Sequence, residues 1–389
     1  MGSDMISPRI LFVRNSRGIT DVTGAETYLL TLIEGLHRAG CAVELLCAVD
    51  ARQGETPWLK TLRARGLPYR TVDVPSKFSI ADLRAGLERA RSFKADVIHA
   101  MDHRSDTVAV LLSLWFGIPA VASFFGWTNW EKTSARARLY PAFDRLIMRR
   151  LKRVIVDSAF IGSQIRSTDA VRQVAVIPNG VDMQRFDADS VVPTFKQRWF
   201  GRDDVTLIGT IGRIHPNKGH IDLARAAGDM LSRNPNLRFV IIGDPPPGHE
   251  DYARELDKVL AETGIGDQFL ITNVPSAEIP DAIASFDITA MPSYMESLSY
   301  VMLESMAMKT PVISARVGGH GELIEDGQNG FLIEPGDVGA LTRKLETLIA
   351  DPELRVRIGE AGQRKVRAEY SIEAMVARTC AVYEEVMTR

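Results

Sequence analysis

Cysteine is scarce in this chain of 389 residues, which contains only Cys41, Cys47 and Cys380. The three cysteines form no Cys-x-x-Cys pair and apolar residues flank each of them, so we expect buried thiols in a reducing compartment rather than a disulfide framework. No apolar run approaches the length of a membrane span, and the first residues lack the basic and apolar segments of a secretion signal. These absences lead us to expect a cytoplasmic protein.

The chain also lacks an excess of charge of either sign, with a formal net charge of −2 at pH 7. This balance provides no overall attraction to nucleic acid, so nucleic acid is not an expected partner and any anionic partner must meet a local patch of cations. At this length a single hydrophobic core stops growing, and two domains are therefore expected.

Short runs rich in Val, Ile and Phe alternate with amphipathic helical stretches, which predicts parallel sheets covered by helices on both faces. A first series of strands is predicted at residues 9–13, 42–48, 69–74, 96–100, 119–124, 153–157 and 174–177. A second series is predicted at residues 205–211, 237–242, 269–271, 287–291 and 311–314, with helix from about residue 338 onward. We therefore predict two doubly wound α/β domains, at residues 5–180 and 200–370, followed by a helical segment at 371–389.

Two common nucleotide-binding motifs are absent. The first strand runs into Arg14-Asn-Ser-Arg-Gly18 instead of a Gly-x-Gly-x-x-Gly turn, which disfavours dehydrogenase chemistry. The loop after the strand at 205–211 is not a Walker A loop either, because Asn217 stands where that motif needs a glycine before its lysine.

What this loop does contain is Gly212-Arg213 and Lys218-Gly219, between a buried strand and a helix predicted to begin near Gly219. Glycines allow a ligand to approach the backbone, and two cations beside a helix N-terminus suit a diphosphate. The alternative interpretation is a solvated loop with two surface cations.

A second informative segment carries two glutamates. A strand is predicted to end at Pro292, a loop contains Glu296, and a helix is predicted to begin near Ser299. Glu304 follows eight residues after Glu296, a span of roughly 12 Å along a continuous helix. An acid within an otherwise apolar helix needs a partner, and the vicinal diol of a ribose would supply one. The alternative is that Glu296 caps the helix and Glu304 pairs with a nearby cation.

Together, the Gly-Arg…Lys-Gly loop, the Glu-x7-Glu spacing and Val317-Gly-Gly319 resemble the C-terminal domain of retaining GT-B glycosyltransferases. This is the large group 1, or family 4-like, set that includes sucrose, mannosyl and lipopolysaccharide transferases. The similarity spans most of the chain and includes Glu334-Pro-Gly-Asp337 downstream, and Val176–Asp182 and Gly24-Ala-Glu26 upstream. It implies a GT-B fold of two Rossmann-like domains facing a central cleft. The N-terminal domain would bind the acceptor and the C-terminal domain the donor, and the final helix would pack back on the N-terminal domain.

The resemblance also implies roles for individual residues. Arg213 and Lys218 would bind the donor diphosphate and stabilise charge on the leaving group. Glu304 would hold the ribose, and Glu296 would contact the hydroxyls of the transferred sugar.

Further contacts implied by the resemblance come from the backbone. The N–H groups of Leu298, Ser299 and Tyr300 would meet the distal phosphate, and Gly24 would let the N-terminal domain approach it. Backbone groups near Val274 and at 242–243 would recognise the base.

One departure from the family concerns histidine. Many members carry a histidine near the reacting sugar, where this chain has Phe125 in Ser123-Phe-Phe-Gly126. His99, at the end of a predicted strand, is the nearest remaining candidate for a catalytic role. The alternative, which we favour, is a strand-end histidine bonded to backbone.

A basic stretch suggests a further partner. Residues 132–153 carry many cations against one acid, Asp144, and an apolar helical stripe of Leu139, Phe143, Leu146, Ile147 and Leu151. Such a helix can lie on an anionic membrane surface, which would make the protein peripheral on the inner face of the membrane. The alternative is a core-facing helix with a basic outer face. Trp127 and Trp130, just before it, would either stack on acceptor sugars or pack against this helix.

The function implied by the resemblance is transfer of a hexose-type sugar, with retention, from a nucleoside-diphosphate sugar to a hydroxyl. We expect UDP- or GDP-sugar as donor, and a glycan, a lipid-linked saccharide or a small metabolite as acceptor. No cofactor or metal is expected, and Asp187-Ala-Asp189 is interpreted as solvated loop rather than an Asp-x-Asp metal motif. The alternatives are a nucleotide-sugar-binding protein without turnover and, more remotely, a GT-B nucleotide-sugar epimerase.

Overall fold

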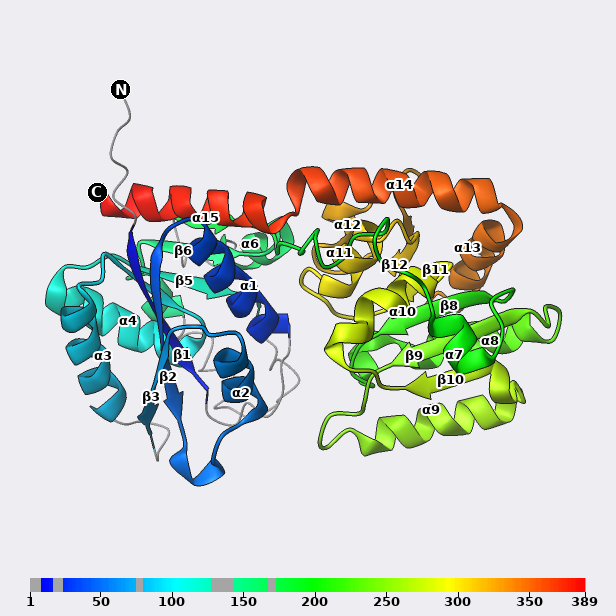
Figure 1. The fold of residues 1–389 in the computed structure, drawn as a ribbon, viewed down its shortest axis with the longest axis horizontal. Helices are drawn as coiled ribbons and strands as arrows, with labels where there is room; N and C mark the ends of the chain where they lie inside the picture. The colour runs from blue at the N-terminus through cyan, green and yellow to red at the C-terminus, as the bar shows by residue number, and fades with distance from the viewer. Residues whose placement is uncertain are drawn as a thin grey trace. The chain divides into compact units, whose positions relative to one another are not determined.

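The computed structural model describes residues 8–16, 24–74, 80–126, 143, 145–166 and 173–388. The chain divides into two compact units (Figure 1). Unit 1 runs to Gly180 and also includes the C-terminal segment from Ile372, and unit 2 covers Val181–Ser371. Each unit contains a sheet of parallel strands with helices against it, which is the predicted doubly wound α/β fold.

The described strands of unit 1 form a seven-stranded sheet in the order β3-β2-β1-β4-β5-β6-β7. Its strands are β1 Arg9–Asn15, β2 Ala42–Val49, β3 Tyr69–Asp73, β4 Val97–Ala100, β5 Ala120–Phe124, β6 Arg153–Val156 and β7 Val174–Val176. Its helices include α1 Gly24–Arg38, the 3-10 turn η1 Ala51–Gln53, α2 Pro57–Ala64, α3 Ile80–Phe93, α4 His103–Phe116, α6 Ala159–Arg166 and α15 Ile372–Met387.

The C-terminal helix α15 lies along α1 within unit 1 (Figure 1). Gly35 on α1 allows this contact, because a Cβ at that position would overlap the side chain of Val376 on α15. The last element of the chain is therefore part of the N-terminal unit.

The strands of unit 2 form a six-stranded sheet in the order β10-β9-β8-β11-β12-β13. They are β8 Thr206–Ile211, β9 Leu237–Ile242, β10 Phe269–Thr272, β11 Ile288–Met291, β12 Val312–Ala315 and β13 Phe331–Ile333. The longer helices are α7 Phe195–Phe200, α8 His220–Leu231, α9 Glu250–Thr263, α10 Ile279–Ser285, α11 Tyr300–Ala307, α13 Val338–Ala350 and α14 Pro352–Glu369. Short turns are η2 Pro216–Lys218, η3 Gly266–Gln268, η4 Ser276–Glu278 and α12 His320–Leu323.

Both faces of this second sheet are buried, which explains why its strands are apolar almost throughout. On β9, Phe239 and Ile241 belong to one core, whereas Val240 and Ile242 belong to the other. Successive side chains of a strand point to opposite faces, so a strand buried on both sides shows no polar alternation.

In each unit the strand order reverses direction beside the first strand. The reversal falls between β1 and β4 in unit 1 and between β8 and β11 in unit 2. In open α/β sheets, ligands bind beyond the carboxyl ends of the strands at such a switch point. The fold therefore points to two positions for ligands, one in each unit.

Two elements were missed at the sequence level. β13 is only three residues long, and α7 lies in the stretch near 180–204 where no periodicity was found. Both are too short to show a hydrophobic period of their own. Within the described residues, no helix combines the length and apolar character needed to cross a bilayer.

Candidate active site

The loops after three adjacent strands of unit 2 meet at the carboxyl edge of the sheet. Lys218 follows β8, Glu296 follows β11 and His320 follows β12, and these strands are neighbours in the order β8-β11-β12. The three side chains are therefore brought together by sheet topology although they are far apart in sequence.

Two glycines let these loops touch. Gly219 has a φ of 67°, and a Cβ there would overlap the carbonyl oxygen of Pro292 in the loop after β11. Gly318 has a φ of 52°, and a Cβ there would overlap the carbonyl oxygen of Glu296. Since L side chains rarely adopt this backbone conformation, only glycine satisfies both requirements. The close approach of backbone segments fixes the site before any ligand binds.

Lys218 and Glu296 form an ion pair inside this site. The Nζ atom of Lys218 lies 2.7 Å from Oε1 of Glu296, and the hydroxyl of Ser293 donates to the same oxygen at 2.9 Å. Burial alone would raise the pKa of Glu296, but the neighbouring Lys218 and His320 and these two hydrogen bonds together lower it below the ordinary value. Glu296 is therefore an ionised acceptor at neutral pH.

Arg213 supplies a second cation at the end of β8. Its side chain is exposed and makes no ion pair or hydrogen bond with the part of the chain that the structure describes. An unpaired guanidinium in the loop that leads to Lys218 is available to an anionic ligand.

Glu304 lies on α11 as a carboxylate without a partner among the described residues. Its side chain is partly buried, and burial raises the pKa of the carboxyl to about 7, while the positive charge of Arg185 opposes that rise. Glu304 therefore forms no ion-pair contact with a described residue, although the charge of Arg185 acts on it. Glu296 does not cap this helix either, because the N-cap residue is Ser299.

The residues expected to contact phosphate and base lie at the start of α11 and just after β10. Leu298 is buried. Ser299 is the N-cap residue of α11 but makes no capping hydrogen bond with its side chain, and Tyr300 is the first helical residue. Val274 follows β10, and its N–H donates to Oδ1 of Asn273 at 2.8 Å. Because this N–H is already used, the backbone of Val274 would contact a ligand through its carbonyl oxygen.

His99 is buried in unit 1 with both ring nitrogens engaged. Nδ1 lies 2.6 Å from the hydroxyl of Tyr383 on α15, and Nε2 lies 2.8 Å from the hydroxyl of Ser123 on β5. Burial lowers the pKa of His99 to about 3, so the ring is neutral. These contacts correct the expectation of a catalytic His99, since neither nitrogen is available to a substrate. The favoured alternative was also wrong in detail, because the partners are side chains rather than backbone.

Two other positions in unit 1 were singled out by sequence. Gly24 is exposed at the first position of α1. Phe125 packs edge-on against Tyr28, with ring centroids 4.9 Å apart. Trp127, Trp130 and residues 132–142 lie outside the described residues.

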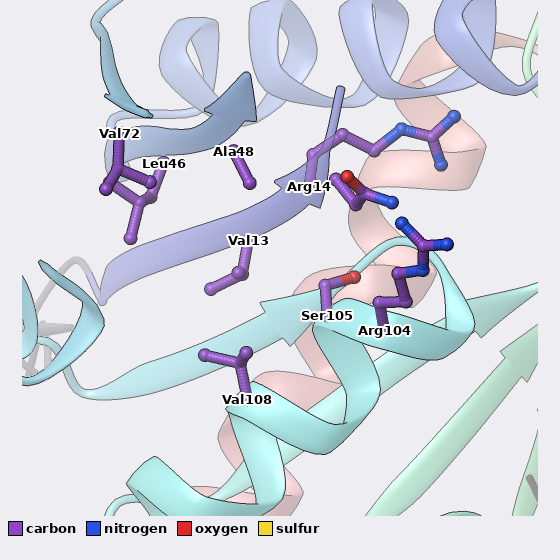
Figure 2. A pocket seen from close by; sticks show the side chains of 9 residues that line it. Val13, Arg14, Leu46, Ala48, Val72, Arg104, Ser105 and Val108 are labelled. Atoms are coloured by element: carbon purple, nitrogen blue, oxygen red, sulfur yellow. The ribbon is translucent and has the colours of Figure 1, made fainter. Parts of the chain in front are cut away.

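Unit 1 has a pocket at its own switch point that the sequence did not indicate (Figure 2). Arg14 and Arg104 lie toward one end of it and apolar side chains toward the other. Arg14 pairs with Glu26 and donates to the carbonyl of Met101 at 2.6 Å. The lining consists of Val13, Arg14, Asn15, Leu46, Ala48, Val72, Arg104, Ser105 and Val108.

Arg104 is held at this pocket by the start of α4. Asp102 caps the helix by accepting hydrogen bonds from the N–H groups of Arg104 and Ser105, and it also accepts one from Asn15 at the end of β1. The Arg104 side chain itself has no ion pair or hydrogen bond within the described ranges. The sequence carried one signal for this arrangement, a capping Asp-x-x-Ser directly after a strand.

Asp187 and Asp189, which resemble an Asp-x-Asp metal motif, bind neighbouring side chains of the protein. Asp187 accepts a hydrogen bond from Ser190 at 2.9 Å, and Asp189 pairs with Lys309 at 2.6 Å. Among the described residues, no cluster of three or more His, Cys, Asp or Glu side chains is arranged to hold a metal ion.

Two parallel doubly wound sheets, with a site of this composition at the switch point of the second, define a GT-B glycosyltransferase. The sequence matches the model of the glycosyl transferase 4-like domain over residues 23–180 and that of glycosyl transferases group 1 over residues 192–365. The chain belongs to this family of glycosyltransferases, which use nucleotide-sugar donors.

Relatives with assigned activities agree with this membership. Sulfoquinovosyl transferase SQD2 of Arabidopsis thaliana is 30% identical over 369 residues, covering 88% of this chain and 67% of that protein. A D-inositol 3-phosphate glycosyltransferase of Stackebrandtia nassauensis is 27% identical over 368 residues, covering 88% and 82%. Alpha-D-kanosaminyltransferase of Streptomyces kanamyceticus is 34% identical over 189 residues, a match that covers 48% of this chain and 47% of that protein.

Solved structures show the same fold. A glycosyltransferase from Rickettsia africae superposes with a TM-score of 0.85 at 20% identity, covering 99% of this chain and 100% of that one. Anabaena HepE in complex with UDP-glucose has a TM-score of 0.81 at 21% identity, covering 97% and 100%. At these identities the likeness extends to the fold and no further.

Proposed function

We propose that this protein transfers a hexose from a UDP- or GDP-sugar to a hydroxyl acceptor, with retention of anomeric configuration. The observation that carries the proposal is the Lys218–Glu296 pair, with Arg213 in the same loop as Lys218. In a nucleotide sugar, an anionic diphosphate is bonded directly to a ring that carries hydroxyl donors. Lys218 and Glu296 lie 2.7 Å apart, so the cation can bind the diphosphate while the carboxylate accepts hydrogen bonds from the adjacent sugar ring. HepE has been solved with UDP-glucose, and a relative from Mycolicibacterium smegmatis is GDP-mannose-dependent, which supports both nucleotides as candidates.

Lys218 and Arg213 would act on the leaving group. As the bond between the anomeric carbon and the phosphate oxygen breaks, negative charge grows on the nucleoside diphosphate. Cations already held in place stabilise that charge without reorganisation, and this lowers the barrier. Glu296 would meanwhile accept hydrogen bonds from the sugar hydroxyls.

Glu304 and the start of α11 would hold the rest of the donor. The Glu304 carboxylate, with no partner among the described residues, fits the two hydroxyls of a ribose. Backbone N–H groups at Leu298, Ser299 and Tyr300 would face the distal phosphate, because a helix N-terminus favours an anion.

The acceptor proton needs a destination, and neither His99 nor Phe125 provides a base. We assign the proton to an oxygen of the departing phosphate, on the same face of the sugar as the attacking hydroxyl. One bond forms between the acceptor oxygen and the anomeric carbon while the bond to phosphate breaks. The new bond then lies on the face that the leaving group occupied, so configuration is retained.

The acceptor would bind in unit 1, beyond the carboxyl ends of its strands, near Arg104 at the start of α4 (Figure 2). The cavity between β1 and α4 has a volume of about 20 Å³, which is enough for a water molecule but not for a sugar. A saccharide, a lipid-linked saccharide or a small metabolite would therefore meet the side chain of Arg104 without entering this cavity. Three free cysteines, two of them buried, support a reducing, cytoplasmic setting.

The test is calorimetric titration of the protein with UDP, GDP, ADP and TDP, repeated on Lys218→Ala and Glu304→Ala. We expect one nucleotide to bind tightly and both substitutions to weaken it. Lys309→Ala is the matched control, because Lys309 also pairs with an acid in unit 2 but lies outside the site. No binding of any nucleotide by the folded protein would contradict the proposal.

A second candidate is a nucleotide-sugar-binding protein without turnover, which the engagement of His99 and the presence of Phe125 favour. Such a protein would bind the donor but neither transfer the sugar nor hydrolyse the donor slowly. Incubation with the tight-binding nucleotide sugar, followed by detection of free nucleoside diphosphate, separates the two. If Phe125→His leaves the rate unchanged, position 125 has no catalytic role here.

A further inference from the structure

Large apolar side chains are exposed on two helical segments of unit 1 that cover one face of its sheet. On α4, Leu114 is 66% exposed and Trp115 is 74% exposed, and Leu111 is exposed beside them. Phe143 and Leu146 are also exposed. A cluster of exposed large apolar residues on a water-soluble unit marks a surface that meets a partner.

The three residues of α4 form a single stripe. Leu111, Leu114 and Trp115 have the i, i+3, i+4 spacing that places side chains on one face of a helix. Ala109 and Leu112 on the opposite side are buried in the core of unit 1. Because Ala109 and Leu112 pack into the core, the side of α4 that carries the stripe faces away from it.

Residues 145–152 cover the same face of the sheet as α4. Met148 and Leu151 belong to the same hydrophobic core as Leu112 of α4, which lies on one face of the sheet. The N–H of Lys152 donates to the carbonyl of Ala120 at 2.8 Å, just after the loop that ends α4. The basic end of this segment is thereby fixed near the C-terminal end of α4, where Trp115 lies.

The structure divides the apolar stripe predicted within residues 132–153. Leu151 is buried and Ile147 packs against the core, as the core-facing interpretation required. Phe143 and Leu146 instead remain exposed, as the membrane interpretation required. The apolar side chains of α4 were not part of either interpretation.

The exposed charged residues of segment 145–153 are all basic. Arg149, Arg150 and Lys152 are exposed, and the described residues offer their side chains no ion pair. In α4 and residues 145–153, the one acid is Asp106, which is buried. We call Leu111, Leu114, Trp115, Phe143, Leu146, Arg149, Arg150 and Lys152 the α4 surface.

We infer that the α4 surface docks on an anionic lipid bilayer. Aromatic and leucine side chains enter the boundary between headgroups and acyl chains, while neighbouring cations attract acidic headgroups. A second copy of the chain fits less well, since a symmetric interface would bring Arg149, Arg150 and Lys152 of both copies together without acids from these segments. The inference is independent of the donor site.

The experiment is co-sedimentation of the full chain with vesicles at low salt. Vesicles of phosphatidylglycerol and phosphatidylcholine are compared with vesicles of phosphatidylcholine alone. We expect binding to the anionic vesicles and at least tenfold weaker binding to the neutral ones. Each cation near the surface contributes about 1 kcal/mol, or about fivefold in affinity, so Arg149→Glu/Arg150→Glu is expected to weaken binding by more than tenfold.

The apolar contribution is tested with Leu114→Ser/Trp115→Ser, whose exposed positions leave the core intact. This variant is expected to bind at least tenfold more weakly, whereas Val356→Ser, at a 60% exposed position in unit 2, is expected to bind like the parent. Trp115 also reports insertion directly, through quenching of its fluorescence by brominated acyl chains. That quenching is measured as the difference between the parent and Trp115→Phe.

Three results would overturn the inference. The first is equal binding to anionic and neutral vesicles, or none to either. The second is a Leu114→Ser/Trp115→Ser variant that binds like the parent. The third is a dimer in sedimentation velocity that dissociates in this variant, which would assign the surface to a second copy.

Discussion

Lys218 donates a hydrogen bond to Glu296 across 2.7 Å, joining the loops after β8 and β11 over 78 residues of sequence. The pair holds a cation and an ionised carboxylate in contact at a switch point of the sheet. The cation of Lys218 contributes to keeping the Glu296 carboxylate in its charged form.

Lys218→Ala is expected to reduce kcat for sugar transfer by about 10²–10³-fold, the range for removing one preorganised donor from a developing charge. Glu296→Gln should reduce sugar transfer while leaving nucleoside diphosphate affinity nearly unchanged, because Glu296 is assigned to the sugar and not to the phosphate. Steady-state kinetics and calorimetry with the free nucleotide distinguish these effects. Equal loss of nucleotide affinity in both variants would contradict the division of roles.

Gly219→Ala is expected to destabilise the protein and abolish donor binding, because the new Cβ would overlap the Pro292 carbonyl and push the two loops apart. Gly264→Ala is the matched control: Gly264 has nearly the same positive φ, 66°, but open space around it. The control isolates the backbone cost of about 1–2 kcal/mol. Thermal unfolding and nucleotide titration of both variants provide the comparison, and indistinguishable behaviour would refute the close-approach argument.

Glu304 is expected to make donor affinity depend on pH. Its pKa is about 7 in the free protein, and a ribose diol donates hydrogen bonds to the ionised form, so binding favours loss of the proton. Affinity should therefore fall as the pH drops below about 7, by up to tenfold for each unit. Calorimetry between pH 6 and 8.5 on the parent and on Glu304→Gln tests this. Ionisation of the diphosphate affects both proteins equally, so a pH profile shared by the two would remove Glu304 as the cause.

The same carboxyl has the opposite effect on stability. Its folded pKa is raised above the ordinary value, so its contribution is favourable below about pH 4.5 and is lost as the pH rises through 7. Glu304→Gln should therefore raise the Tm by a few degrees above pH 7 and by less near pH 5. Scanning calorimetry without ligand measures the difference, and a lower Tm in the variant at pH 8 would show that the carboxylate has a stabilising partner.

Tyr383→Phe is expected to destabilise unit 1 without changing the rate of sugar transfer, because it leaves a buried nitrogen of His99 unpaired, at about 1–3 kcal/mol. His99 also has a depressed pKa, so its contribution is complete above about pH 6.5 and is lost as the pH falls toward 3. Thermal unfolding between pH 4 and 8 measures both effects. Tyr69→Phe, on the edge strand β3, is the control. A folded Tyr383→Phe protein with selectively reduced kcat would return His99 to the catalytic candidates.

Much of the fold follows from local patterns in the sequence. Strands such as β8 and β9 are buried on both faces, so they are continuous apolar runs that can be recognised without a structure. β13 and α7 could not be recognised in this way, because three or six residues are too few to establish a period.

The candidate site was predictable in its members but not in its contacts. Arg213, Lys218, Glu296 and Glu304 were identified from motif spacing and from the need of a buried acid for a partner. The ion pair between Lys218 and Glu296 was not identified, since it depends on β8 and β11 being neighbours in the sheet. Arg104 was missed because its significance depends on the pocket formed with β1.

By itself, then, the sequence determined the alternation of strands and helices, the two-domain organisation it implies and the residue types available for a nucleotide sugar. These depend on hydrophobic period and local turn chemistry, which act over a few residues. The tertiary structure alone decided that His99 meets Tyr383 across 284 residues, which of two glutamates carries an ion pair and which apolar side chains stay exposed on α4. Such outcomes depend on the order of the strands in the sheet and on which face of each helix packs into the core. No local segment of sequence encodes either.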